Sequence, residues 1–165
     1  MYGMRSKYTD YASYSKARLT TMFSRADLKD AGMLRVTTLE SVYLENQGGK
    51  FVSRPLPHPA QFAPIYAMTL LDFNKDGKMD LIVAGNQSSI RIRMGVIDAN
   101  FGQLYNGDGK GNFAYVSQPE SGLRLTGDTK SLQVVQSKRE TFLLVGTNNV
   151  GVNTYKLQEV NVIND

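Results

Sequence analysis

Oxygen-bearing side chains recur at close intervals in one short stretch of the chain, LLDFNKDGKMDLIVAGN, residues 70–86. The four are Asp72, Asn74, Asp76 and Asp80. Counted from the first aspartate they stand at positions 1, 3, 5 and 9, and the main-chain carbonyl of Lys78 stands at position 7. Gly77, at position 6, permits the sharp turn that folds them inward. Hard oxygen ligands in this number are typical of Ca²⁺, which accepts about six to eight of them.

Two other interpretations of this stretch compete with a calcium loop. An EF-hand begins with the same spacing but needs a bidentate glutamate at position 12 and a helix on each side. Position 12 is Val83, within an apolar run, so the EF-hand fails and Asp80 is predicted as the bidentate closing ligand. The simpler alternative is a polar hairpin loop in which Asp and Asn side chains accept hydrogen bonds from backbone amides.

The loop lies within a repeated β-unit, because a shift of 62 positions superimposes one part of the chain on another without a gap. The matched pairs are Tyr43 and Tyr105, Gly49 and Gly111, Phe51 and Phe113, Pro57 and Pro119, Leu70 and Leu132, Leu81 and Leu143, Val83 and Val145, and Asn86 and Asn148. Each copy consists of a strand, a glycine-rich turn, a strand, a longer connection and two further strands. We expect each copy to form a four-stranded antiparallel sheet, like the blade of a β-propeller.

An amino-terminal segment with a different period precedes the repeats. Its apolar residues recur at helical spacing from Thr9 to about Asp30, with Thr9 or Asp10 as a cap and Ser24 as the cap of a second short helix. The predicted fold class is therefore all-β with an N-terminal helical addition. The predicted domains are a helical segment, 1–37, a repeat with the calcium loop, 38–99, and a second, degenerate repeat, 100–165.

The second repeat lacks the oxygen ligands of the first. The residues at the equivalent positions are Val134, Gln136, Lys138 and Phe142. A repeat that folds the same hairpin without carboxylates indicates that the turn alone does not require them. Two blades cannot close a ring, which typically needs about four to eight. We therefore expect the chain to be the end of a longer protein, or to complete its sheet edges by association.

These motifs carry a family resemblance over about residues 38 to 157. DFNKDGKMDLIVAG resembles the calcium loop of FG-GAP (VCBS-type) repeats, the blades of integrin alpha-chain propellers. LYNGDGKGNF and its counterpart YLENQGGKF resemble the glycine-rich hairpin of the same repeats, and the arrangement is most similar to exported bacterial proteins of the cartilage-acidic-protein type. The resemblance implies propeller blades, an exported location, and a role in adhesion or in binding a protein or carbohydrate. It implies a Ca²⁺ ion on Asp72, Asn74, Asp76, the carbonyl of Lys78, and Asp80.

No pairing of a nucleophile with a base is visible in the sequence, so we expect a binding module rather than an enzyme. One alternative is part of a propeller enzyme whose active site lies mainly in blades outside this chain. Another is an assembly role that does not need calcium. The partners expected are the remaining blades or a second copy of the chain, together with a ligand that the sequence does not identify.

Composition and charge exclude several other classes. The chain has 165 residues, no cysteine and a net charge of +4. Disulfides, thiolate zinc sites and cysteine nucleophiles are therefore excluded. No apolar stretch approaches the ~20 residues of a membrane-spanning helix, and the amino terminus lacks the apolar middle of a signal peptide. The basic residues form no long run, so we expect no nucleic-acid partner.

Three candidates for ligand contacts carry positive charge or a titratable ring. Arg91 and Arg93 alternate with apolar residues in a predicted strand, which indicates a solvated face, with an anionic ligand as the lesser alternative. His58 lies between two prolines and is interpreted as a loop residue held extended rather than as a catalytic group.

The remaining candidates are three tyrosines and one glycine-rich turn. The spacing of Tyr8, Tyr11 and Tyr14 is typical of a helix packed on a neighbour rather than of a platform for sugars. In NGDGKGN, Asp108 has no carboxylate partner at ligand spacing. This turn is predicted to be a tight hairpin rather than a phosphate cradle, since Lys110 is followed by glycine instead of Ser or Thr.

Overall fold

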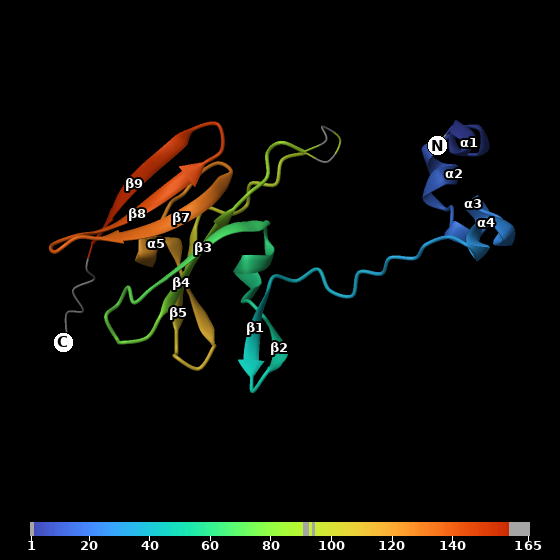
Figure 1. Cartoon of the computed structure of the whole chain (residues 1–165). Helices are drawn as coiled ribbons and strands as arrows, with labels where there is room; N and C mark the ends of the chain where they lie inside the picture. The colour runs from blue at the N-terminus through green and yellow to red at the C-terminus, as the bar shows by residue number, and fades with distance from the viewer. Residues whose placement is uncertain (1, 91–92, 94, 159–165) are drawn as a thin grey trace. The chain divides into compact units, whose positions relative to one another are not determined.

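The computed structural model describes residues 2–90, 93 and 95–158 (Figure 1). Internal contacts divide the chain into two compact units, Met1–Leu39 and Glu40–Asp165. The sequence had placed the end of the helical segment at residue 37. Each unit is described separately below.

The amino-terminal unit consists of short helices. They are α1 (Tyr2–Lys7), α2 (Tyr11–Ser15), α3 (Leu19–Met22) and α4 (Arg25–Lys29). The predicted caps at Asp10 and Ser24 are confirmed, since their side chains accept hydrogen bonds from the amides of Ser13 and Asp27. The second predicted short helix is confirmed as α4, but the first predicted helix is divided into α2 and α3. Helices α2 to α4 bury no side chain. Helices this short have little stability without tertiary packing. None of the described helices is both long and apolar enough to cross a membrane.

The carboxy-terminal unit is built from antiparallel strands, so the all-β prediction is confirmed at this level. The strands are β1 (Val42–Gln47), β2 (Lys50–Pro55), β3 (Ile65–Leu71), β4 (Asp80–Gly85), β5 (Gln103–Gly107), β6 (Phe113–Val116), β7 (Thr129–Gln136), β8 (Thr141–Thr147) and β9 (Gly151–Leu157). A 3₁₀ helix, η1 (His58–Gln61), and a short α-helix, α5 (Gln118–Ser121), lie in the connections. The described strands form open sheets and no closed ring.

The strand order corrects the predicted blade boundaries. The sheets are β1-β2, β3-β4-β5-β6 and β7-β8-β9, so the four-stranded sheet takes two strands from each repeat. The prediction that each repeat forms its own four-stranded sheet was therefore wrong. The physical reason is the pairing of β4 with β5, which buries Leu81 and Val83 beside Tyr105. A predicted strand around 89–96 is also absent among the described residues, where only an isolated bridge joins Gln87 to Ile97.

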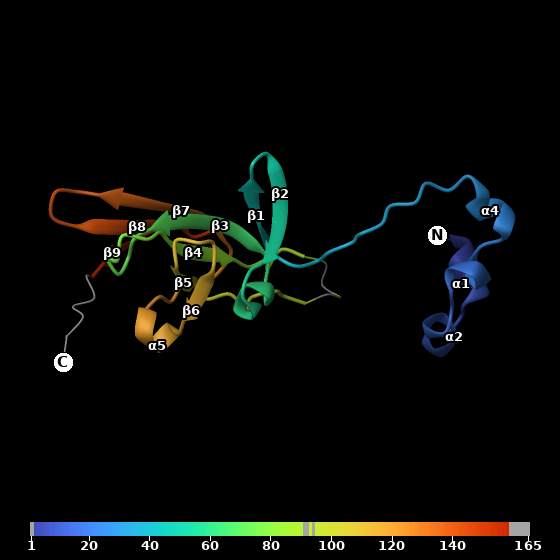
Figure 2. The same ribbon diagram turned by 90° about the horizontal axis from the view of Figure 1, so that it is seen from below.

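The central four-stranded sheet packs against other elements on both faces. We call the face that carries Leu81 and Val83 its front face and the opposite face, which carries Ile82 and Ala84, its back face. The back face packs on the sheet β7-β8-β9 and forms the larger core. The front face packs against η1 through Ala60 and forms a smaller core. Every residue of β4 is accordingly buried, and the two sheets are seen stacked edge-on in Figure 2.

The two repeats share a bulge but not a gapless alignment. In the β3-β4 pair the register shifts between Ile65 and Ala67, and in the β7-β8 pair it shifts between Thr129 and Ser131. Residues of β7 therefore stand two positions later than the 62-residue shift predicts, whereas β8 follows that shift. An offset of two keeps every side chain on its original face, because side chains alternate along a strand. Met68 thus corresponds to Leu132 in structure.

Candidate metal centre

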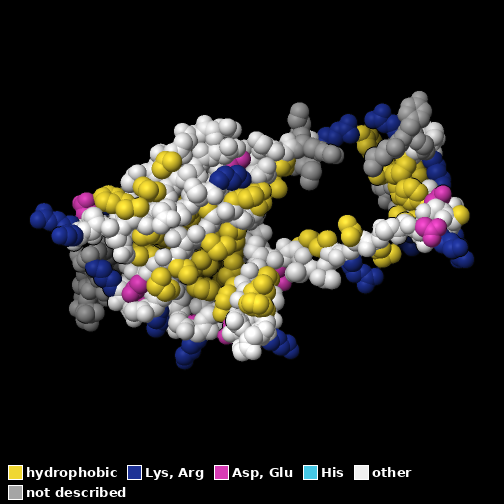
Figure 3. Space-filling model, in the orientation of Figure 1, with side chains coloured by type: hydrophobic (Ala, Val, Ile, Leu, Met, Phe, Trp, Pro, Cys, Tyr) yellow, Lys and Arg dark blue, Asp and Glu magenta, His cyan; other side chains and the backbone are white. Residues whose placement is uncertain are grey.

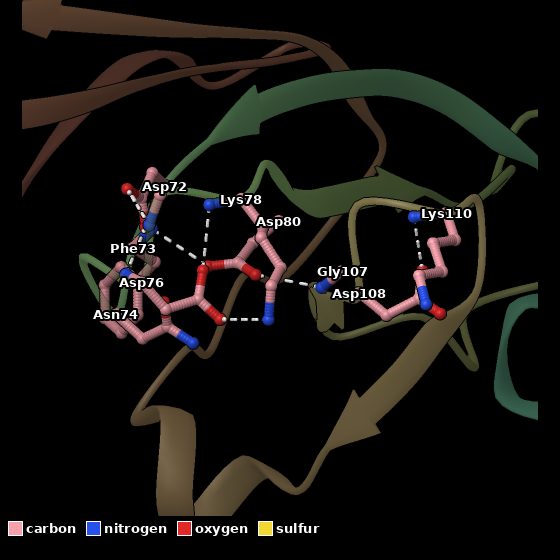
Figure 4. A network of polar contacts seen from close by, with 10 residues as sticks. Asp72, Phe73, Asn74, Asp76, Lys78, Asp80, Gly107, Asp108 and Lys110 are labelled. Carbon is pink, nitrogen blue, oxygen red and sulfur yellow. Dashed lines mark hydrogen bonds and ion pairs between the residues drawn. The ribbon is translucent and has the colours of Figure 1, made fainter.

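The predicted calcium loop spans residues 72–79 and joins β3 to β4. Its backbone turns sharply at Lys75, with φ of 60°, and at Gly77, with φ of 81°. A φ in this left-handed region favours glycine at position 77, because a side chain there is strained. The loop projects from the strand ends as a hairpin tip with the polar residues drawn in Figure 4.

The side chains of Asp72 and Asn74 hold the loop in shape through its own amides. Asp72 accepts from the amide of Asp76 at 3.1 Å with one carboxylate oxygen, and from the amide of Gly77 at 2.9 Å with the other. Asn74 shares the amide of Asp76 through its Oδ1 at 3.0 Å. Each of these oxygens keeps a lone pair for another ligand, since carboxylate and amide oxygens accept more than one hydrogen bond.

Asp76 is exposed. Its Oδ1 accepts from the amide of Lys78 at 2.9 Å, and its Oδ2 lies 3.3 Å from the Lys78 ammonium. The Lys78 amide is the main cause that lowers the pKa of Asp76 below its ordinary value, so the group is charged at neutral pH. An exposed ion pair of this kind contributes little energy, and a divalent cation can displace the ammonium.

Asp80 differs from the other three because its side chain is fully buried. Its Oδ2 accepts from the amide of Phe73 at 2.9 Å, and its Oδ1 accepts from the amide of Gly107 at 2.9 Å. Asp80 therefore ties the loop to the end of β5 (Figure 4). Residue 107 must be glycine for this approach, because a Cβ there would lie 2.1 Å from the carbonyl oxygen of Met79.

The loop offers calcium ligands of the right chemistry, although they do not form an assembled cluster. Its donors are all oxygens, three carboxylates and one amide, which fits a hard cation. In the part of the chain that the structure describes, no three His, Cys, Asp or Glu side chains gather closely enough to hold a metal ion. Asp80 already uses both oxygens on backbone amides. The ligand set predicted from the sequence thus stays a prediction, with a structural role added for Asp80.

The equivalent hairpin of the second repeat is a different turn and not a matched control. Residues Val134 and Gln136 lie in β7 and Phe142 lies in β8, so only Lys138 falls in the turn 137–140. That turn is shorter than 72–79, and Ser137 closes it by accepting from the amide of Glu140 at 3.0 Å. The longer loop of the first repeat therefore needs an explanation of its own.

The glycine-rich turn after β5 is the predicted tight hairpin, since β5 and β6 pair directly across it. Asp108 accepts from the amides of Lys110 at 2.7 Å and of Asn112 at 3.0 Å. Hydrogen bonds from the Asn112 side chain and from these amides lower the pKa of Asp108 to about 2. Its carboxylate is thus engaged in shaping the turn.

The remaining predicted candidates do not converge on this loop. The predicted extended conformation of His58 was wrong, since His58 begins η1, and its ring contacts Phe62 edge to face at 5.0 Å. Tyr8 and Tyr14 contact each other edge to face at 6.0 Å, within the amino-terminal unit. Tyr11 is exposed. Of the two arginines considered as ligand contacts, Arg93 is exposed in the connection between β4 and β5, and Arg91 lies outside the described residues.

Sequence reasoning missed a polar network at the opposite end of β4. Asn86 is buried at a φ of 84°, and its amide group bonds the backbone of Asn100 and Gly127. Nearby, buried Asp128 accepts from the amide and hydroxyl of Ser88. The repeat match of Asn86 with Asn148 was the available signal, but Asn148 is exposed and does not share this role.

A cleft of about 440 Å³ lies beside the loop, between α5 and the end of β9. Its lining includes Phe73, Ile82, Leu104, Glu120, Arg124 and Lys156. Because Phe73 also donates its amide to Asp80, the loop and the cleft share a wall.

Comparison of the chain with known protein families, with curated proteins and with solved structures gave no match.

Proposed function

We propose that the chain is a calcium-binding β-repeat module of the FG-GAP type, and that its role is to bind a ligand rather than to catalyse a reaction. The observation that carries the proposal is the loop 72–79, which presents oxygen atoms on Asp72, Asn74 and Asp76 from within a few residues. The corresponding turn of the second repeat is shorter and carries no such set.

In this proposal the residues of the loop 72–79 and the buried Asp80 have separate tasks. Asp72, Asn74, Asp76 and the carbonyl of Lys78 hold the ion, and Asp80 anchors the loop to Gly107 while it completes the ligand set. Bound Ca²⁺ would offset the mutual repulsion of the carboxylates. The side chain of Lys78 leaves Asp76 when the ion binds, because the two cations compete for one carboxylate.

The ligand-binding role is proposed for the cleft beside Phe73. Its lining combines the apolar side chains of Ile82 and Leu104 with the charged side chains of Arg124 and Lys156. Apolar surface beside charged groups that can orient a ligand is a common feature of binding sites. Since Phe73 follows directly after Asp72, an ion on the loop would hold this wall of the cleft in place. The proposed ligand is a protein or a carbohydrate, as the resemblance to FG-GAP repeats implies.

The test is thermal unfolding with and without calcium, after treatment with a chelator. At about 1 mM Ca²⁺ and a dissociation constant of ~0.1 mM, binding stabilises the fold by about 1.4 kcal/mol. The melting temperature should rise by a few degrees. Asp76→Ala should abolish the rise, whereas Lys78→Ala should keep it because Lys78 contributes its carbonyl.

Asp108→Ala serves as the matched control, because Asp108 shapes a similar turn outside the predicted ligand set. It should leave the calcium-dependent rise unchanged. Equal melting temperatures with and without calcium in the unmodified protein would contradict the proposal and leave the loop as a capped turn.

A further inference from the structure

Two equivalent positions of the repeat differ sharply in exposure. Met68 and Leu70 on β3 are 65% and 52% exposed. The register of the two hairpins places them in the same positions as Leu132 and Val134 on β7. Leu132 is only 9% exposed, and Val134 packs against the larger core. The same kind of apolar side chain is thus covered in one sheet and open in the other.

The cover over Leu132 is the back face of the central sheet. There Ala67, Ile82 and Ala84 pack on Leu132 and Leu143. We call the face of β7-β8-β9 that carries Leu132 its front face, by analogy with the central sheet. The chain therefore contains one established contact of a front face on a back face. Small residues such as Ala67 and Ala84 let the two sheets approach.

The back face of β7-β8-β9 repeats the pattern of the back face that is already in use. Ser131 takes the place of Ala67, and Gly146 takes the place of Ala84. Leu144 takes the place of Ile82, and Val135 beside it is 43% exposed. The small residues and the large apolar residue thus recur at matching positions, on a face where Ser131 and Gln133 are also exposed.

The front face of the central sheet is covered over only part of its width. The smaller core lies under η1, and the β1-β2 hairpin reaches Phe113 through Tyr43 at 6.1 Å. Hydrophobic side chains remain visible over β3 and the β1-β2 hairpin in Figure 3. The uncovered part therefore coincides with Met68 and Leu70.

The β1-β2 hairpin supplies a second, independent indication. In the alignment of the two repeats this hairpin corresponds to the β5-β6 hairpin, since Tyr43 matches Tyr105 and Phe51 matches Phe113. The β5-β6 hairpin continues the sheet begun by β3 and β4, whereas β1 and β2 pair only with each other among the described strands. Unpaired strand edges of this kind readily accept another strand.

We propose that copies of this chain associate head to tail, with the back face of β7-β8-β9 in one copy docked on the front face of β3-β4-β5-β6 in the next. The docking repeats the sheet contact already present within the chain. The two surfaces differ, so the contact is heterologous and produces a ring or an open chain.

The test is the mass of the full chain in solution, measured by light scattering over a wide range of protein concentration. The unmodified protein should form dimers and larger species as its concentration rises. Met68→Glu alters the front face and Val135→Glu alters the back face, and both residues are exposed, so the fold should survive. Each variant alone should associate at least tenfold more weakly. Met33→Glu, at an 80% exposed residue of the amino-terminal unit, is the matched control and should associate normally.

Mixing the two variants gives the sharper result. A Met68→Glu copy keeps an intact back face, and a Val135→Glu copy keeps an intact front face, so the mixture should form a dimer and stop there. A protein that stays monomeric at every concentration overturns the proposal and assigns the front face to another segment or partner. So does a mixture in which both variants remain monomeric, or a Met68→Glu variant that assembles like the unmodified chain.

Discussion

Replacement of Asp80 should destabilise the fold whether or not calcium is present. Its buried carboxylate accepts hydrogen bonds from the amides of Phe73 and Gly107, each at 2.9 Å. A hydrogen bond to a charged group contributes about 1.5–3 kcal/mol. Asp80→Ala removes both bonds and leaves two amides without their acceptor, so the free energy of unfolding should fall by about 3–5 kcal/mol.

Urea unfolding in the presence of a chelator measures this loss without any contribution from an ion. With a slope near 2 kcal/mol per molar urea, the midpoint of Asp80→Ala should fall by about 1.5–2.5 M. Asp80→Asn keeps one acceptor oxygen and should lose about half as much. Asp98→Ala, at an exposed aspartate between β4 and β5, should leave the midpoint unchanged. A midpoint of Asp80→Ala within experimental error of the unmodified protein would refute the anchoring role.

Three further predictions concern the close approach beside this anchor and the polar network at the other end of β4. Gly107→Ala should lower the urea midpoint markedly, because the new Cβ would meet the Met79 carbonyl oxygen at 2.1 Å; an unchanged midpoint would contradict the close approach. Asp128 has a pKa below its ordinary value of 3.8, mainly because the Ser88 amide donates to it, so its contribution to stability is present above that pH and is lost as the pH falls below it. Asp128→Asn should therefore flatten the acid limb of a stability-against-pH curve, and a limb of unchanged slope would count against this role. Asn86→Ala should cost about 2–4 kcal/mol in urea unfolding, because it removes the partner of both the buried amide and the buried carbonyl of Asn100. A loss below about 0.5 kcal/mol would show that the network does not bear on stability.

The sequence predicted features that depend on local signals. The caps at Asp10 and Ser24, the hairpin between β5 and β6, and the position of the loop between β3 and β4 all follow from residue types a few positions apart. The same holds for the β-rich character of the repeats. Such features were predicted because the groups that interact are near neighbours in the chain.

Features that depend on distant partners were missed. The sheet boundaries follow from the pairing of β4 with β5 across the connection 86–102. Neither strand contains a local sequence signal that identifies its pairing partner. The role of Asp80 depends on Gly107, which lies in the other repeat. The two-residue offset of β7 was hidden because an even offset preserves the alternation of buried and exposed residues.

Calorimetric titration of the chelator-treated chain with calcium tests the central claim most directly. The account predicts a saturable heat with one site per chain and a dissociation constant of about 10⁻⁴ to 10⁻³ M. The heat should vanish in Asp76→Ala and persist in Asp108→Ala. No heat from the unmodified protein, or an equal heat from Asp76→Ala, would contradict the assignment of calcium to the loop 72–79.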